Sequence, residues 1–212
     1  MYASPEAAGE VRWSPDSSQV RLITHTRYAK SVTLDLIDAA TGATRPLITE
    51  SSKTYVELSG LGELPMVETL SNGDVLWFSE RTGYGHLYVY DGKTGRMKRA
   101  LTQGNWTVRN VLKVDEAHDA IYVAGNERQG SDPYYRHIYR VRLSDGHVTP
   151  LTPEDADHYV PSAQEAAYPG RPGALHADLS RGFAPSGRYF IDSYSRVDLP
   201  AKPYCALPTA RL

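Results

Sequence analysis

Residues 87–102 decide the fold, and they read LYVYDGKTGRMKRALT. Two other stretches repeat this pattern: residues 32–49 read VTLDLIDAATGATRPLIT, and residues 139–152 read YRVRLSDGHVTPLT. Asp91 lies 53 residues after Asp38 and 54 residues before Asp145, so the spacing is nearly constant. Self-similarity at a period of about 50 residues is typical of repeat architectures.

Each copy has the pattern of a β-hairpin. Apolar residues alternate before the turn, as at Leu87 and Val89, which is the period of a strand with one buried face. An aspartate and a glycine then supply the turn, because aspartate bonds to nearby backbone and glycine accepts a positive φ. A second hairpin is expected before each copy. Its turn, in residues 13–18, 70–73 and 115–118, leads into a strand in residues 19–23, 74–78 and 119–123, and a fourth such turn in residues 183–187 leads into residues 188–191. Each unit therefore contains four short strands joined by tight turns.

These units predict an all-β fold, a partial β-propeller of about four four-stranded antiparallel blades. We expect residues 1–212 to form a single domain, with blades at approximately 10–49, 55–102, 106–152 and 176–212. Residues 153–175 are expected to be an insert. The last blade is expected to be incomplete, because Pro200, Pro203 and Pro208 each remove a backbone donor from its third and fourth strands. A β-sandwich also has frequent turns, but it does not require a register-matched repeat.

The composition limits the possible partners. Tyrosine is unusually frequent, with 15 Tyr against 3 Phe, and it suits half-buried pleated surfaces. The formal net charge is −2 and the basic residues are scattered, which argues against nucleic acid as a partner. Cys205 is the only cysteine, so the chain can form neither an internal disulfide nor a thiolate metal cluster.

The compartment stays open. No apolar stretch approaches the roughly 20 residues that a membrane span requires. Residues 1–6 lack the charged and apolar segments of a signal peptide. Both a periplasmic and a cytoplasmic location are compatible with these features.

Four segments are more specific than a generic blade. Residues 77–88 read WFSERTGYGHLY, residues 101–108 read LTQGNWTV, and residues 183–190 read FAPSGRYF; between the last two lie Asn126, Glu127 and the run from His137 to Tyr139. In this order and spacing they resemble the N-terminal propeller of dipeptidyl peptidase IV-type serine peptidases, in the prolyl oligopeptidase family. The resemblance extends from about Trp13 to Leu199.

The resemblance implies a partner domain and a role. In that family an eight-bladed propeller caps an α/β-hydrolase domain, and this chain is similar to blades five to eight. The implied role is to admit, orient or exclude peptide substrates while the hydrolase domain cleaves them. The chain itself is expected to be no enzyme, because no glycine is followed two residues later by serine and the Gly-x-Ser-x-Gly elbow is therefore absent. The family's adjacent pair of glutamates is also absent.

Residues 57–65 form the candidate substrate-binding loop. The loop precedes the second blade, and its glycines permit unusual backbone shapes. By position it resembles a family segment near the substrate pocket, so Glu57 and Glu63 are candidate substrate-binding residues. The alternative is a plain connection between two blades.

The histidines point away from a metal site. The chain has seven histidines without the close pairing that zinc sites usually show. His86 and His137 occupy equivalent positions in two blades, which predicts structural bonds to a neighbouring strand. Asp155, Asp157 and His158 are interpreted as a solvated acidic loop rather than a cation site. We therefore expect no metal and no cofactor.

The partners expected from this interpretation are the peptide substrate and the hydrolase domain of the parent enzyme, which the resemblance implies to be a serine-type dipeptidyl or prolyl peptidase. A run of blades also leaves two terminal faces, so a homo-oligomer joined through these faces is one expectation. The alternative is that residues 153–175 and the proline-rich tail fold over one open face and keep the chain monomeric. A rival hypothesis from another class is a stand-alone, TolB-like scaffold propeller that binds a protein partner.

Overall fold

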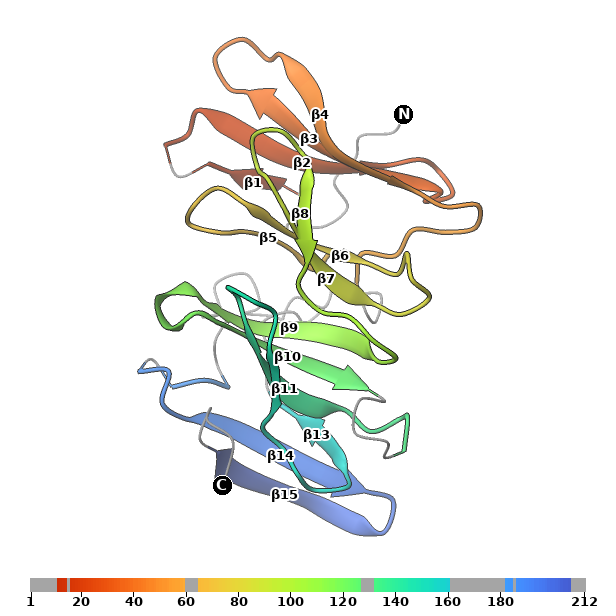
Figure 1. The fold of residues 1–212 in the computed structure, drawn as a ribbon, viewed down its shortest axis with the longest axis vertical. Coiled ribbons are helices and arrows are strands. Elements are labelled where there is room, and N and C mark those ends of the chain that lie inside the picture. The colour runs from red at the N-terminus through yellow and green to blue at the C-terminus, as the bar shows by residue number, and fades with distance from the viewer. Residues whose placement is uncertain are drawn as a thin grey trace, which may run out of the picture.

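The computed structural model describes residues 11–14, 16–59, 65–126, 132–160, 182–184 and 186–206. These residues form four antiparallel sheets, stacked in the order of the chain (Figure 1). The first sheet contains β1 (Val11–Trp13), β2 (Gln19–His25), β3 (Ser31–Asp38) and β4 (Thr44–Ser51). The second contains β5 (Val67–Thr69), β6 (Val75–Ser79), β7 (His86–Tyr90) and β8 (Met97–Ala100).

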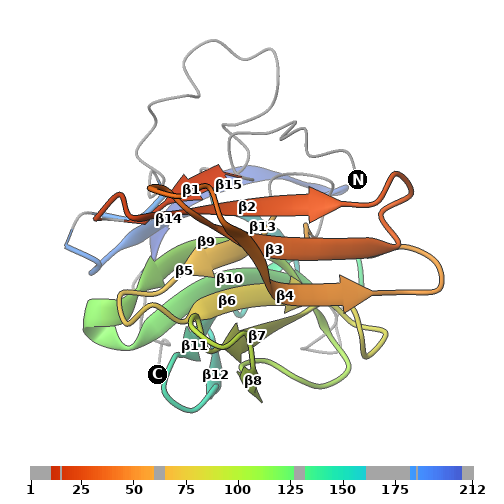
Figure 2. The same cartoon turned by 90° about the horizontal axis from the view of Figure 1, so that it is seen from above.

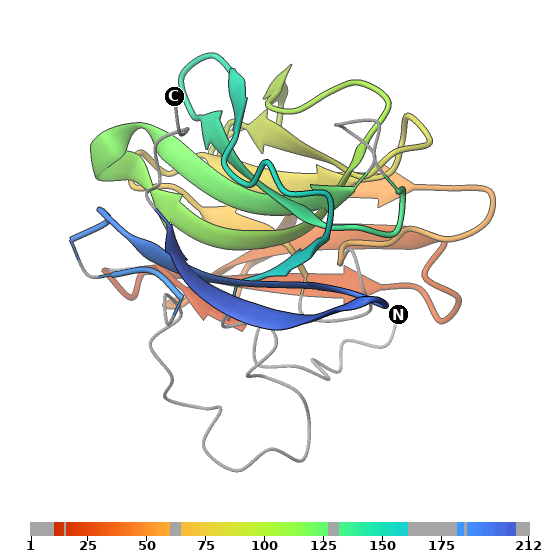
Figure 3. The ribbon, with the colours of Figure 1, turned by 90° about the horizontal axis from the view of Figure 1, so that it is seen from below.

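The third sheet contains β9 (Thr107–Asp115), β10 (Ala120–Asn126), β11 (His137–Arg142) and β12 (Val148–Pro150), with the short 3₁₀ helix η2 (Glu116–His118) between β9 and β10. The fourth contains β13 (Asp157–Tyr159), β14 (Phe190–Arg196) and β15 (Leu199–Ala206). Strands pair with their neighbours in sequence, so each sheet is a simple meander. Seen from above, the first sheet is nearest (Figure 2), and seen from below the fourth is nearest (Figure 3). The predicted all-β partial propeller is confirmed.

Apolar side chains between the sheets form the core. The second sheet is buried on both faces, with two sets of side chains alternating along β6 and β7. One set packs toward the first sheet and the other toward the third; the sets are Val75, Trp77, Tyr88 and Tyr90, and Leu76, Phe78, Leu87 and Val89. The sequence pattern predicted that each strand has one buried face, whereas β7 is buried on both. Tyrosine explains this difference, because its ring packs in the core while its hydroxyl reaches the edge of the sheet. Tyr88 and Tyr90 therefore read as half-polar positions although both are buried.

The hairpin turns follow the predicted chemistry. Oδ1 of Asp91 accepts hydrogen bonds from the Lys93 and Thr94 backbone amides and from the Thr94 hydroxyl, at 3.0, 2.8 and 2.9 Å. These bonds lower the pKa of Asp91 to about 2. Asp38 makes the same three kinds of bond with Ala40 and Thr41.

In the second and third sheets, the threonine that follows the last apolar residue of the unit accepts a hydrogen bond from the neighbouring strand. Thr102 Oγ1 accepts the Leu87 backbone N–H at 3.0 Å, and Thr152 Oγ1 accepts the Ile138 N–H at 2.9 Å. Both threonines are buried, so each hydroxyl satisfies a donor that water does not reach. The repeated Leu-Thr at the end of a unit is thereby explained.

The fourth sheet differs from the expectation in two places. Asp157–Tyr159, inside the predicted insert 153–175, forms β13 and pairs with β14. Residues 199–206 form β15 along β14, although the prolines predicted that the third strand would be missing. Pro203 is tolerated because β15 is an edge strand of its sheet, where one side of the backbone needs no donor. Pro208 lies outside the described residues.

Candidate functional site

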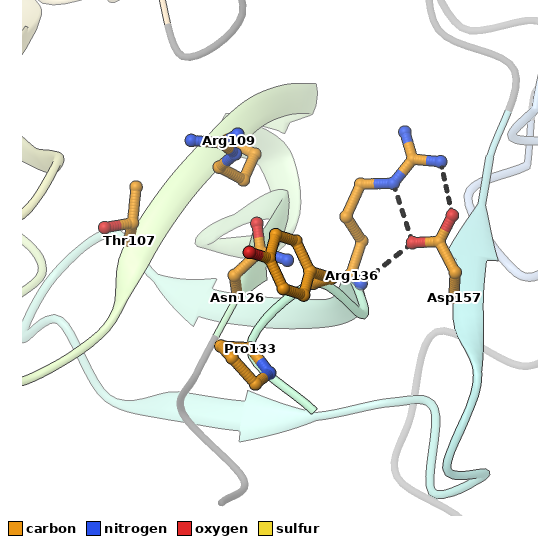
Figure 4. A pocket seen from close by; sticks show the side chains of 7 residues that line it. Thr107, Arg109, Asn126, Pro133, Arg136 and Asp157 are labelled. Atoms are coloured by element: carbon orange, nitrogen blue, oxygen red, sulfur yellow. Dashed lines mark hydrogen bonds and ion pairs between the residues drawn. The ribbon is translucent and has the colours of Figure 1, made fainter. Parts of the chain in front are cut away.

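A cavity of about 540 Å³ lies at one end of the third and fourth sheets. Its lining comes from four segments: the start of β9, the end of β10, the approach to β11 and the start of β13. The residues are Thr107, Arg109, Asn126, Pro133, Tyr134, Arg136 and Asp157. In Figure 4, Thr107 and Arg109 lie on one side, Arg136 and Asp157 on the other, and Asn126 between them.

Arg136 and Asp157 form a rigid wall of this cavity. The Asp157 carboxylate accepts the Arg136 backbone N–H at 2.9 Å, the Nε–H at 2.9 Å and a terminal N–H at 2.8 Å (Figure 4). Burial opposes ionisation of Asp157, but these bonds and the guanidinium charge lower its pKa. A bidentate pair of this kind fixes both side chains, and it ties the third sheet to the fourth.

Arg109 has a different environment. It is half-buried on β9, and it makes no hydrogen bond or ion pair within the part of the chain that the structure describes. Together, Arg109, Arg136 and Asp157 give the lining one net positive charge. The cavity therefore combines a guanidinium that makes no hydrogen bond with the described residues, the Thr107 hydroxyl and the apolar surface of Pro133.

The predicted loop lies near the second sheet rather than in the cavity lining. Oε1 of Glu57 accepts the Leu58 and Ser59 backbone amides at 2.9 and 2.7 Å and the Ser59 hydroxyl at 2.8 Å. One carboxylate oxygen is thus engaged by its own loop. Glu63 lies outside the described residues. The role of both glutamates in substrate binding stays a prediction.

Glu80 belongs to the segment of residues 77–88 on which the family resemblance rests, and it was not predicted as a site residue. Burial and the negative charge of Glu57 raise its pKa, while the charge of Arg109 opposes this shift. Glu80 is therefore close enough to both Glu57 and Arg109 for their charges to act on its carboxyl. Glu80 follows β6 and Arg109 lies on β9, so these charged groups come from the second and third sheets.

The two equivalent histidines are structural, as predicted. His86 Nδ1 lies 3.1 Å from Thr102 Oγ1, and its Nε2 lies 2.9 Å from the Gly104 carbonyl oxygen. His137 Nδ1 lies 3.3 Å from the Thr152 carbonyl oxygen. Burial lowers the pKa of both rings, and in His137 the charge of His158 adds to this effect.

The interpretation of residues 155–158 as a solvated acidic loop is wrong for Asp157 and His158. His158 is fully buried, and its Nδ1 lies 2.7 Å from Asp192 Oδ2 on β14. Asp157 forms the ion pair with Arg136. Both polar side chains are held by partners that are distant in sequence, Arg136 and Asp192. The sequence of the loop alone does not show these partners.

Among the residues that the structure describes, no group of three or more His, Cys, Asp or Glu side chains is placed to hold a metal ion. No helix in that part of the chain has the length and apolarity required to cross a bilayer.

The sequence reasoning missed most of the cavity. Thr107 and Asn126 lie in segments quoted for the family resemblance, and Asp157 was interpreted as part of an acidic loop, but Arg109 and Arg136 carried no local signal. Their common feature is a position at the same end of adjacent strands, which becomes visible only after the strands are paired. Chemically, the cavity can bind an extended polar group through its guanidinium and hydroxyl donors.

Comparison with known proteins gives one consistent result. The family model described as "Dipeptidyl peptidase IV (DPP IV) N-terminal region" matches residues 3–201. A probable dipeptidyl peptidase 4 of Aspergillus clavatus is 24% identical over 210 residues, which cover 96% of this chain and 24% of that protein. Dipeptidyl peptidase 4 of Arthroderma otae is 31% identical over 122 residues, covering 58% of this chain and 13% of that protein.

The crystal structure of Porphyromonas gingivalis dipeptidyl peptidase 4 has the same fold. It superposes with a TM-score of 0.68 at 19% identity, covering 92% of this chain and 24% of that one. The chain thus spans about a quarter, or less, of the length of these relatives. Because the family model matches nearly all of the sequence, the chain belongs to the dipeptidyl peptidase IV N-terminal region family.

Proposed function

We propose that this chain is the non-catalytic part of a peptidase related to dipeptidyl peptidase IV, and that it admits and positions peptide substrates for a hydrolase domain of the same protein. The observation that carries the proposal is the family match over residues 3–201. The rival hypothesis of a stand-alone scaffold propeller is not favoured by these comparisons, since the relatives reported above are all peptidases by name.

Two features of the chain support the absence of catalysis. The sequence contains no Gly-x-Ser-x-Gly elbow, in which a strained turn exposes the nucleophile. The described residues form antiparallel sheets, whereas the elbow stands at the turn between a strand and a helix. A serine without this machinery loses many orders of magnitude in rate.

Glu57 and Glu63 are proposed as substrate contacts within this role. The support for Glu57 is its position near Glu80. The two residues are close enough for the charge of Glu57 to raise the pKa of the Glu80 carboxyl. Its second oxygen remains available to a substrate ammonium group, since the hydrogen bonds of its loop use Oε1.

The test is to incubate the purified chain with X-Pro and X-Ala dipeptide anilides and, separately, with a fluorophosphonate that labels activated serines. We expect no chromophore release above buffer and no stoichiometric labelling. A full-length dipeptidyl peptidase serves as the positive control. Labelling of one serine in every chain, or turnover that the fluorophosphonate blocks, would contradict the proposal.

A further inference from the structure

The cavity at one end of the third and fourth sheets is lined by an arginine whose N–H donors meet no acceptor among the described residues, although its charge acts on the carboxyl of Glu80. Arg21, Arg81, Arg99 and Arg136 each donate to an acceptor on another strand or turn. Arg109 makes no such bond within the described ranges, although it is half-buried on β9 and lines the cavity. A half-buried guanidinium is costly to desolvate unless an anion or acceptor meets it.

The shape of the Arg109 guanidinium favours a carboxylate as that anion, although the nearby Glu80 carboxyl shares its charge. The guanidinium is a planar fork whose N–H groups match two carboxylate oxygens. Thr107 lies two residues earlier on the same strand and also lines the cavity, where it adds a hydroxyl donor. Asp157, the one acidic group among the described lining residues, is already paired with the Arg136 guanidinium and accepts three hydrogen bonds from Arg136.

The rest of the lining favours a peptide over a small free anion. The cavity of about 540 Å³ is much larger than a carboxylate needs. Pro133 and the exposed ring of Tyr134 offer apolar surface for the carbon atoms of a peptide. Asn126 donates through Nδ2 to the Tyr135 carbonyl at 2.9 Å, which fixes its amide, so Oδ1 can accept a peptide N–H.

We infer that this cavity is a binding site for a peptide carboxylate, with Arg109 as the residue that recognises the charge. The carboxylate comes from an acidic side chain or from a peptide C-terminus; both present the same two oxygens to the guanidinium. The inference concerns binding alone and does not depend on the proposed role in a peptidase.

Binding of fluorescent hexapeptides to the purified chain tests this inference. One peptide carries an internal Glu and an amidated C-terminus, a second carries Gln and a free C-terminus, and a third carries Gln and an amidated C-terminus. We expect the first or second peptide to bind at least about tenfold more tightly than the third, because a charge-assisted hydrogen bond is lost in the neutral peptide. The better of the two charged peptides identifies the source of the carboxylate.

Arg109→Gln should reduce the affinity for the charged peptide by about tenfold or more and leave the neutral peptide unchanged. The matched control is Arg96→Gln, which makes the same charge change at an exposed turn residue at the opposite end of the second sheet, between β7 and β8. This control should retain wild-type affinity. Thermal melting of both variants checks that they fold.

Nuclear magnetic resonance on the wild-type chain keeps the test decisive if Arg109→Gln fails to fold. The charged peptide should shift the Arg109 Nε–H and Asn126 side-chain amide signals and leave those of Arg96 in place. Equal binding of charged and neutral peptides, wild-type affinity in Arg109→Gln, or shifts confined to other residues would each overturn the inference. A chain that binds the peptides but cleaves none leaves the proposed function intact.

Discussion

Gly95 lies in the turn between β7 and β8 of the second sheet, where this turn contacts the first sheet. Its φ is +68°, and a Cβ added there would lie 1.7 Å from the Leu47 carbonyl oxygen on β4. Gly146 repeats this contact one blade later, with 2.3 Å to the Leu101 carbonyl oxygen. Gly42 has the same conformation, with φ +70°, but a Cβ there would meet nothing within 4 Å. The glycine of the turn therefore serves two purposes: local backbone shape at all three positions, and close approach between sheets at two of them.

The pair Gly95→Ala and Gly42→Ala separates these two purposes. Gly42→Ala should lower the free energy of unfolding by about 1–2 kcal/mol, the usual penalty for an L-residue in the left-handed region. Gly95→Ala should lower it by roughly 3 kcal/mol or more, because backbone atoms must also move apart. Urea denaturation of both variants measures the difference. Equal losses would show that the contact with Leu47 does not constrain the stack.

At the scale of elements, β13 and β14 are joined by the buried pair of His158 and Asp192. Both nitrogens of His158 face acceptors: Nδ1 lies 2.7 Å from Asp192 Oδ2, and Nε2 lies 3.0 Å from the Glu154 carbonyl oxygen. Only the doubly protonated ring donates to both. Burial lowers the pKa of His158, but the hydrogen bonds to Asp192 and Glu154 and the charge of Asp192 more than offset it, so the pKa is raised above 6.5.

His86 is buried like His158, but its pKa is shifted in the opposite direction. Its Nε2 donates to the Gly104 carbonyl, while Nδ1 faces the Thr102 hydroxyl, which can donate in turn. A neutral ring satisfies both contacts. The pKa of His86 is accordingly lowered by burial, and the bond to Gly104 only partly opposes the shift.

Replacing His158 should therefore have a pH-dependent effect. Because the folded-state pKa is raised, the charged pair stabilises the fold fully below about pH 6.5 and loses this contribution as the pH rises through the raised pKa. His158→Gln should lower the free energy of unfolding by about 3 kcal/mol at pH 5.5 and by less at pH 9. Urea denaturation at both pH values is the measurement, with the exposed His147→Gln as control. A loss that does not change with pH, or that grows toward pH 9, would contradict the assignment.

At the scale of the whole molecule, the stack has two terminal faces. In the first sheet, Ile23, Leu34 and Leu36 pack against the second sheet. Because neighbours along a strand point to opposite faces, Val20, Leu22 and Ile37 point away from it. Trp13 pairs with Val20 on this outward face and is 62% exposed. An apolar face of this kind is suited to association with another surface.

The expected homo-oligomer should therefore depend on Trp13. Light scattering over a dilution series should give a mass above the 23.5 kDa of a single chain at high micromolar concentration. Trp13→Ser should weaken association by about tenfold, since it removes a large apolar side chain from the interface. Tyr28→Ser removes an equally exposed aromatic ring from a turn and should have no effect. A monodisperse mass near 23.5 kDa throughout would rule the association out.

The sequence by itself determined the repeating unit, because its signals are local. The alternation at Leu87 and Val89, the turn built by Asp91 and the hydrogen bond of Thr102 all act between residues of one hairpin. Such contacts repeat wherever the same short pattern repeats. The structural role of His86 and His137 could be predicted for the same reason.

Only the tertiary structure decided what lies between the sheets. His158 and Asp192 are 34 residues apart, and the cavity joins residues from four segments. No local pattern relates such residues, since their approach depends on how one sheet stacks on the next. The same holds for β13 and β15, whose short or proline-containing segments form strands because β14 provides a partner on each side. A backbone group buried by stacking must find a partner, and this requirement overrides the weak local preference of the segment.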